Sequence, residues 1–283
     1  MDTLVFPFNL RWSTLLRYST MLVVAALMLL PLAWMFVSSL RPAAGIFQYT
    51  SVFSWRTFVP ESITLDNYRE VFRSDFPKAL TNSFFIGAVT VVIGIFVNSA
   101  AGFAFAVFEF RFKRLLFVLV MVTFMVPFES IVIPLYQLIR TLGWVNSYKA
   151  LIVPAIANGF VIFLFRQFVA ALPRELYEAA RVDGASWWQI YWKIVLPLSF
   201  PTIVTAALMM FILQWEAFFW PLVAASGEDF TVVQVALARH TTAEQTAWGR
   251  LFGSMSIAVL VPMVLYLLAQ RFYIRTISGT GMK

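Results

Sequence analysis

Long apolar runs constrain this chain more than any other feature of its sequence. A helix needs about 20 apolar residues to cross the hydrocarbon core of a bilayer, and six runs approach that length. They are residues 18–37, 84–108, 115–135, 150–165, 200–222 and 251–269. With 61% hydrophobic and only 12% charged residues, the chain has too little polar surface to cover itself in water. The sequence therefore predicts an all-α integral membrane protein with six transmembrane helices.

Helix-breaking residues interrupt two of these runs. The third run contains Pro127 and Pro134, and the short fourth run contains Pro154, Asn158 and Gly159. Such breaks are tolerated in a membrane where neighbouring helices or a wet cavity satisfy the freed backbone groups. Ordinary kinks between packed helices are the simpler interpretation, and a cavity is the functional one.

The distribution of Lys and Arg predicts the orientation. An even number of spans places both termini on one side, and cytoplasmic loops carry an excess of basic residues. The termini and the loops at 109–114 and 166–193 hold 12 of the 21 basic residues, whereas the longer opposite loops hold 9. We therefore expect both termini in the cytoplasm and the first span as an uncleaved anchor. The net charge of +7 then reflects topology, and no nucleic-acid partner is expected.

The cytoplasmic loop at about 171–197 has the pattern of two short helices. Pro173 suits a first helical turn, and Gly184 stands where a helix would end in the left-handed conformation. Ser186 and Gln189 form a capping-box pattern that starts a second helix. One interpretation is a helix pair lying passively on the lipid surface. The other is a rigid projection that docks into a partner.

The same loop carries a spaced motif, E-A-A, three residues, Gly, nine residues, I-x-L-P. Its fixed positions are Glu178, Ala179, Ala180, Gly184, Ile194, Leu196 and Pro197. The motif resembles the EAA loop of the permease subunits of binding-protein-dependent ABC importers. Residues 63–68, 133–136 and 215–221 are similar to the MalG-type carbohydrate branch of that family, and the resemblance covers about residues 18–283.

The resemblance implies a type I ABC importer permease fold in the bacterial cytoplasmic (inner) membrane. In that family the EAA loop, which here includes Asp183, is a coupling helix that docks into an ATPase subunit. The C-terminal tail, here 270–283 with Arg275 and Lys283, reaches between the ATPase subunits. The implied organisation is an N-terminal part, 1–83, with the tail, first helix and external loop, followed by a core permease domain, 84–283.

The implied partners are a second homologous permease subunit, two ATP-binding cassette subunits, an extracytoplasmic solute-binding protein and membrane lipid. No Gly in the chain is followed by Lys, so the chain lacks the G-x-x-x-x-G-K-[ST] loop that holds ATP phosphates. We therefore expect no cofactor bound by this chain and no catalytic residue. ATP–Mg would be used by the partner ATPases to drive the uptake of a sugar, oligosaccharide, polyol or glycerol-phosphate-like solute.

Two carboxylates, Glu129 and Glu216, fall inside the apolar runs. An ionisable group within the bilayer is costly unless it faces a cavity or a partner. The candidate substrate path therefore comprises Glu129, Asn158, Gln214, Trp215, Glu216 and Phe219; Glu216 stands where the family commonly has Asn. In the alternative interpretation, Glu129 is simply hydrated near the outer interface. The small residues Gly87, Gly94 and Ala101 share a helix face with Asn98 and predict close helix packing.

Two other classes of protein remain as alternatives. An ion-coupled secondary transporter would use Glu129 and Glu216 as its ion sites, but it predicts repeats of hydropathy and leaves the 171–197 loop unexplained. A membrane enzyme is disfavoured because the chain has no Cys and a single His, His240, in an outer loop. The same composition argues against a metal site.

Overall fold

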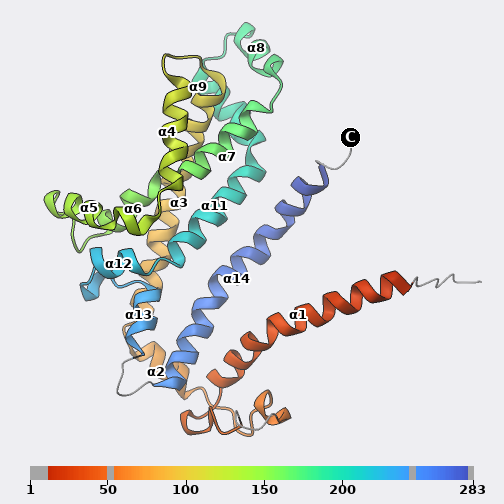
Figure 1. Ribbon diagram of the computed structural model, residues 1–283, viewed down its shortest axis with the longest axis vertical. Coiled ribbons are helices and arrows are strands. Elements are labelled where there is room, and N and C mark those ends of the chain that lie inside the picture. Colours follow the sequence, from red (N-terminus) through yellow and green to blue (C-terminus); the bar gives the residue numbers. More distant parts are fainter. Residues whose placement is uncertain (1–11, 50–53, 242–246, 280–283) are drawn as a thin grey trace, which may run out of the picture. The chain divides into compact units, whose positions relative to one another are not determined.

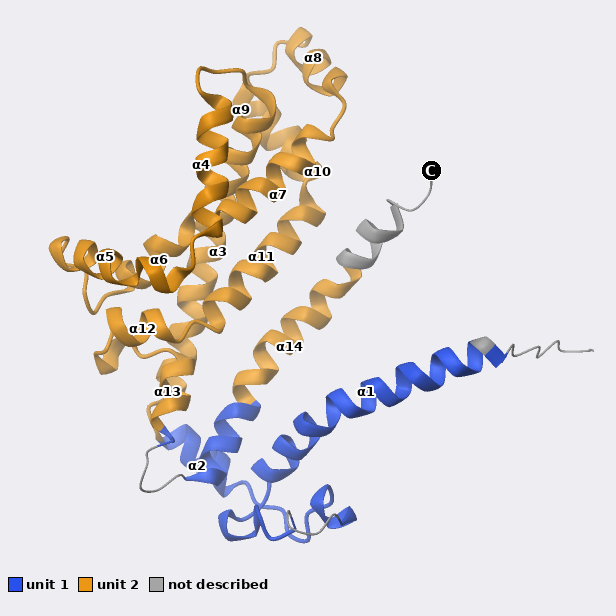
Figure 2. Cartoon of the chain, in the orientation of Figure 1, with its two compact units in different colours: residues 1–73, 240–256 blue, residues 74–239, 257–283 orange. Residues whose placement is uncertain are grey.

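The computed structural model describes residues 12–49, 54–241 and 247–279, and their regular structure is helical, as expected. The chain divides into two compact units (Figure 2). Unit 1 comprises the chain up to Arg73 together with His240–Ser256, and unit 2 comprises Ser74–Arg239 together with the chain from Ile257 onward. One helix, α14 (Trp248–Gly279), contributes to both units.

Unit 1 contains a long helix and an irregular segment stitched by polar side chains. Its elements are α1 (Trp12–Ser39), η1 (Ala43–Gly45), η2 (Trp55–Thr57), α2 (Asp66–Arg73) and the start of α14. The buried Asn67 side chain donates to the carbonyl oxygens of Ser39 and Arg41, at 2.8 and 2.7 Å. Arg41 in turn donates to the carbonyl of Thr57 at 2.9 Å. These bonds satisfy backbone groups that the loops leave without helical partners.

Unit 2 holds the remaining helices (Figure 1). They are α3 (Phe76–Val107), α4 (Lys113–Met125), α5 (Phe128–Thr141), α6 (Tyr148–Ile156), α7 (Gly159–Ala170), α8 (Arg174–Val182), α9 (Trp187–Ile190), the π-helix η3 (Tyr191–Val195), α10 (Leu196–Leu198), α11 (Phe200–Trp215), α12 (Phe219–Ala224), η4 (Glu228–Phe230), α13 (Val233–Arg239) and the rest of α14.

Among the described residues, four helical segments are long and apolar enough to cross a membrane, and the number rises to six if each of two bent pairs is one span. The segments are Thr14–Ser39, Phe76–Val107, Tyr148–Ala170 and Trp248–Arg271. One bent pair is α4 with α5, and the other joins Trp187–Leu198 to α11. The upper count equals the six spans expected from the sequence.

The third and fifth runs differ from single straight spans. The third bends by 102° between α4 and α5, where Pro127 precedes the first residue of α5, whereas Pro134 lies inside α5 without ending it. The fifth run stops as a helix at Trp215 and resumes at Phe219. Proline cannot donate a backbone hydrogen bond, so a bend at Pro127 costs the fewest lost bonds.

Helix α3 is the centre of unit 2, because small residues bring other helices against its backbone. A Cβ atom added at Gly94 would lie 3.1 Å from the carbonyl oxygen of Ile156, and one added at Gly102 would lie 2.9 Å from the nitrogen of Arg166. At Gly87 the added atom would meet the ring of Phe211 at 2.9 Å. The expected close packing is therefore confirmed at Gly87 and Gly94, and Gly102 adds a third close approach.

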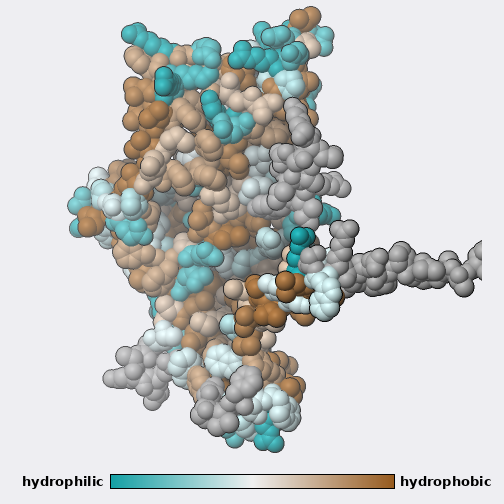
Figure 3. Space-filling model, turned by 45° about the vertical axis from the view of Figure 1, so that its right-hand side comes forward, coloured by the Kyte–Doolittle hydropathy of each residue, from teal (hydrophilic) through white to brown (hydrophobic). Residues whose placement is uncertain are grey.

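The surface of unit 2 changes in character along its length (Figure 3). Hydrophilic residues gather at the end that holds α8 and α9, and the surface beside them is mostly hydrophobic. This pattern is expected if the helices stand in lipid and the α8–α9 segment projects into water.

Candidate functional site

The break between α6 and α7 is held by one side chain from α3. Asn98, which is fully buried, donates through Nδ2 to the carbonyl oxygen of Ile156 at 2.8 Å and accepts from the backbone N–H of Asn158 at 2.9 Å. Asn158 then caps α7, since its Oδ1 accepts from the N–H of Val161 at 3.1 Å. The backbone groups that a broken membrane helix exposes are thus paired inside the protein.

A second adaptation lies one turn earlier in α6. Pro154 has no N–H, so the carbonyl of Ala150 loses its helical donor. The indole Nε1–H of Trp220 in α12 fills that place at 2.9 Å. The next carbonyl of α6, that of Leu151, accepts a hydrogen bond of 3.0 Å from Nε2 of Gln214 in α11. Two helices far along the chain are thereby fixed to the proline-containing turn.

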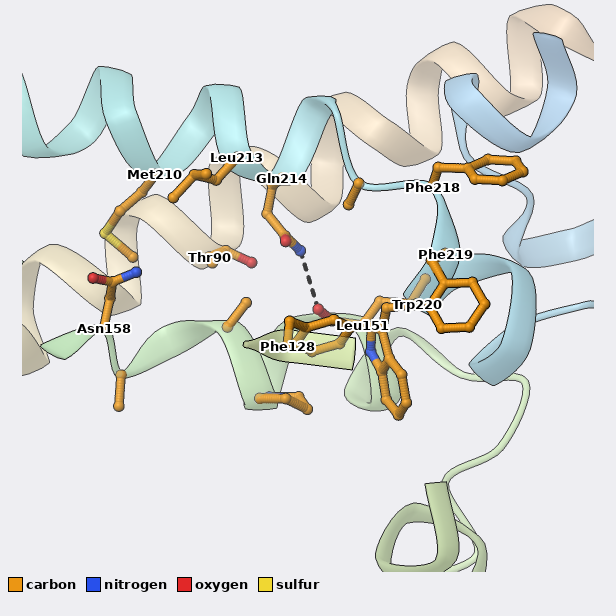
Figure 4. A pocket seen from close by; sticks show the side chains of 14 residues that line it. Thr90, Phe128, Leu151, Asn158, Met210, Leu213, Gln214, Phe218, Phe219 and Trp220 are labelled. Carbon is orange, nitrogen blue, oxygen red and sulfur yellow. Dashed lines mark hydrogen bonds between the residues drawn. The ribbon is translucent and has the colours of Figure 1, made fainter. Parts of the chain in front are cut away.

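A cavity of about 460 Å³ lies where these helices meet (Figure 4). Its walls come from α3, α5, α6, α11 and α12, together with the two breaks that adjoin α7 and α12. The wall is mainly apolar and aromatic, with three polar side chains. The lining residues are Thr90, Phe128, Leu151, Pro154, Ala155, Ala157, Asn158, Met210, Leu213, Gln214, Ala217, Phe218, Phe219 and Trp220. A concave apolar site with a few placed polar groups is typical of small-molecule binding.

The cavity unites three of the six candidate path residues, Asn158, Gln214 and Phe219. Trp215 is buried elsewhere: its Nε1–H donates to the carbonyl of Ala258 at 3.2 Å, and its ring stacks on that of Phe211 at 5.6 Å between centroids.

The two carboxylates adjoin the cavity without lining it. Glu129 lies in the first turn of α5 beside the lining residue Phe128, and Glu216 follows the last residue of α11 beside Ala217. Both side chains are exposed at the protein surface.

Two lining residues were missed by the sequence analysis, Thr90 and Trp220. A signal for Thr90 was present, because it stands three residues after Gly87 and four before Gly94, on the close-packed face of α3. The role of Trp220 follows from Pro154, which frees a carbonyl that needs a donor. No spacing in the sequence joins those two residues, since 70 positions separate Trp220 from the carbonyl that it serves.

The 171–197 loop folds as two capped helices, as expected. Helix α8 ends before Gly184, whose φ of +81° lies in the left-handed region that favours glycine. Ser186 and Gln189 form a complete capping box at the start of α9, with bonds of 3.2 and 2.7 Å. Across the turn, Arg181 donates to the carbonyl of Ala185 at 2.7 Å, and its guanidinium lies 5.3 Å from the ring centre of Trp187.

The motif residues are spread over this segment. Glu178, Ala179 and Ala180 lie on α8, Asp183 and Gly184 form the turn, Ile194 lies in η3, and Leu196 and Pro197 lie in α10. Asp183, Gly184 and Ile194 surround a surface depression of about 380 Å³. Of the two tail residues, Arg275 lies in the part of α14 whose side chains the structure does not describe, and Lys283 lies outside the described residues.

The loop is anchored to α3 by a buried hydroxyl pair. Tyr191, in the π-helix η3, is 1% exposed, and its hydroxyl lies 2.8 Å from Oγ of Ser99. Ser99 directly follows Asn98, which holds the α6–α7 break. The projecting loop and the break beside the cavity are therefore attached to consecutive residues of one helix.

The bent apolar helices, the cavity at their breaks and the projecting EAA loop together define a membrane transport permease. The chain belongs to the family described as "Binding-protein-dependent transport system inner membrane component", which matches residues 90–276. It is thus a permease subunit of an ABC importer.

Named relatives and a solved structure agree with this assignment. The chain is 32% identical to the "Arabinooligosaccharides transport system permease protein AraQ" of Halalkalibacterium halodurans, over 92% of this chain and 93% of that one. It is 31% identical to the "sn-glycerol-3-phosphate transport system permease protein UgpE" of Yersinia pestis, over 90% and 92%. A bacterial ABC transporter involved in the import of the acidic polysaccharide alginate shares the fold, with a TM-score of 0.82 at 21% identity, over 96% of this chain and 100% of that chain.

Proposed function

We propose that this chain is the permease subunit of an ATP-driven importer that takes up a carbohydrate delivered by an extracytoplasmic solute-binding protein. The observation that carries the proposal is the EAA loop, folded as a rigid helix–turn–helix and anchored beside a cavity at the α6–α7 break. The names of relatives such as AraQ support a carbohydrate as the solute. The glycerol phosphate named for UgpE keeps a related polyol phosphate within the proposed range.

The energy for transport comes from two partner ATPases, which bind and hydrolyse ATP–Mg. Helix α8 and the turn at Asp183 and Gly184 dock into the ATPase, and Ile194, Leu196 and Pro197 hold the second helix of the loop against the membrane spans. When ATP draws the two ATPases together, the loop moves with its ATPase. The Tyr191–Ser99 pair then transmits the displacement to α3 and to the walls of the cavity.

The solute passes at an interface between this chain and a second, homologous permease. The cavity formed by Thr90, Asn158, Gln214 and Phe219 belongs to that path. Alternating access follows from two arrangements of the permease pair, one favoured by ATP and the other by its hydrolysis. In this arrangement the EAA loop and both termini are cytoplasmic, and Arg275 and Lys283 of the tail reach the ATPases.

The test compares two glycines that both adopt the left-handed backbone conformation. Gly184 and Gly143 both have positive φ, +81° and +69°, and a Cβ atom at either position meets nothing within 4 Å. Val at either site therefore introduces a similar backbone strain, of about 1–3 kcal/mol, but only Gly184 lies in the proposed docking loop. We expect Gly184→Val to lower both ATPase co-purification and ATP-driven uptake at least tenfold, and Gly143→Val to leave co-purification within twofold.

The experiment is a gentle-detergent purification from native membranes, with mass spectrometry of the proteins that accompany the chain. An ATPase, a second permease and a solute-binding protein are the expected companions. Equal co-purification by the two Val variants would contradict the role of the loop. Uptake that collapses with a protonophore while ATP is held constant would favour the ion-coupled alternative, in which Glu129 and Glu216 carry the ion.

A further inference from the structure

A buried hydroxyl in the cavity has no hydrogen-bond partner among the described residues. Thr90, on α3, is 1% exposed, and its Oγ1 makes no hydrogen bond among the described residues. Several helical threonines of this chain bond the carbonyl four residues back, as Thr81 does to Pro77 at 2.9 Å and Thr205 does to Pro201 at 3.0 Å. A buried polar group without a partner is penalised, so its presence needs an explanation. Thr90 lines the cavity, and Figure 4 shows its hydroxyl on the side where Gln214 and Leu151 lie.

A second polar group that could meet a ligand beside Thr90, the side-chain amide of Gln214, is already oriented. Gln214 donates its Nε2 to the carbonyl of Leu151, which leaves Oε1 as the acceptor that the side chain offers. A hydroxyl donates and accepts, and an amide oxygen accepts. Thr90 and Gln214 therefore match a ligand that carries several hydroxyl groups.

The aromatic side chains of the cavity wall are also held in place by contacts within the protein. The indole of Trp220 is held by its bond to Ala150, and the ring of Phe128 stands edge-on to it, 6.1 Å between centroids and at 82°. Phe218 and Phe219 complete this part of the wall. The C–H faces of a sugar ring are apolar and pack against aromatic faces, while its hydroxyl groups lie at the rim.

The uncharged lining of the cavity favours neutral over anionic carbohydrates. None of the described residues that line the cavity is charged. At the start of α7, which would otherwise attract an anion, two donors are already engaged: the N–H of Asn158 bonds Asn98, and the N–H of Val161 bonds Asn158. Glu129 and Glu216 are next in sequence to lining residues, and their negative charge would not neutralise the charge of an anion. An anion here would be unpaired in an apolar site, which is heavily penalised.

From these observations we infer that the cavity binds a neutral sugar ring, with the Thr90 hydroxyl as a direct hydrogen-bonding contact, in preference to a phosphorylated or uronic-acid solute. The inference rests on the proposed function and narrows its range of solutes.

The test measures uptake into proteoliposomes that hold the assembled transporter with its partner subunits and binding protein. The labelled probes are arabinotriose, lactose and trehalose as neutral solutes and sn-glycerol 3-phosphate as the anion. The wild-type transporter should take up at least one neutral probe in an ATP-dependent way and the anion poorly. Thr90→Val, which removes the hydroxyl at nearly constant volume, should raise the half-saturating concentration about tenfold, and Thr90→Ser should restore it to within about threefold of wild type.

The matched control is Thr205→Val, because the hydroxyl of Thr205 is satisfied within α11 and lies outside the cavity wall. This control should keep the wild-type half-saturating concentration. The inference is overturned if Thr90→Val also keeps it, or if the anion is taken up as well as the neutral probes. If Thr90→Val fails to assemble, the wild-type comparison of neutral and anionic probes still decides the charge class. If wild type shows no ATP-dependent uptake of any probe, the proposed carbohydrate function itself fails.

Discussion

Replacing Asn98 by Leu tests how the α6–α7 break survives in a membrane. Leu has nearly the same size but no polar atoms, so the carbonyl of Ile156 and the N–H of Asn158 both lose their partner. Leaving one buried polar group unpaired costs about 1–3 kcal/mol, so two such groups should lower the free energy of unfolding by about 2–6 kcal/mol. The third bond of Asn98, to the carbonyl of Gly94, adds little because that carbonyl is already inside a helix.

The assay is reversible unfolding of the purified chain in mixed detergent micelles, followed by helical circular dichroism. Thr205→Val is again the control, because it removes a hydroxyl that is bonded only within its own helix; we expect a change below about 1 kcal/mol. A loss of less than 1 kcal/mol in Asn98→Leu would refute the reasoning. It would mean that the two backbone groups find other partners, or that the break is hydrated.

Three further changes test other contacts. Trp220→Phe keeps an aromatic ring but removes the N–H that serves the freed carbonyl in α6, so the free energy of unfolding should fall by about 1–3 kcal/mol. An unchanged unfolding midpoint would contradict this role. Tyr191→Phe removes one hydroxyl of the buried pair on α3 and should cost about 1–3 kcal/mol in the same assay; an unaltered stability would show that the pair does not anchor the loop. Ser186→Ala removes the capping box, at a cost of about 1 kcal/mol. The amide of Gln189 should then exchange hydrogen faster, and an equal rate in both proteins would mean that the cap does not hold this turn.

Local sequence signals account for most of the helices and for the loop. Apolar length located α1, α3 and α14, because a membrane span needs nothing beyond a run of apolar residues. The Gly184 turn and the capping box at Ser186 were predictable since their bonds join residues only three or four apart. Such patterns are complete within one short segment.

The cavity could be anticipated only in part, because long-range contacts decide which side chains face it. Trp215 was expected on the path together with Gln214, its neighbour. The two side chains leave α11 in different directions, and a partner in α14 takes the indole of Trp215. For Thr90 the sequence offered only its spacing from Gly87 and Gly94. Its place in the cavity wall and its missing i−4 bond, which distinguish it from Thr205, are features of the folded protein. Proline in the sequence indicated bends, but the 102° angle at Pro127 depends on packing.

The side-chain hydrogen bonds to the carbonyl groups of α6 also set an order of assembly during synthesis. Asn98 leaves the ribosome 58 residues before the carbonyl of Ile156 that it serves, so α3 can already be in the bilayer when α6 arrives. Trp220, by contrast, is made 70 residues after Ala150, which is about 4–14 s later at ordinary rates of translation. During that interval the proline-containing turn of α6 has an unpaired carbonyl. Until α12 is inserted, a water molecule, a lipid headgroup or the insertion machinery must serve that carbonyl, and this turn is a point at which the nascent permease is exposed to misfolding.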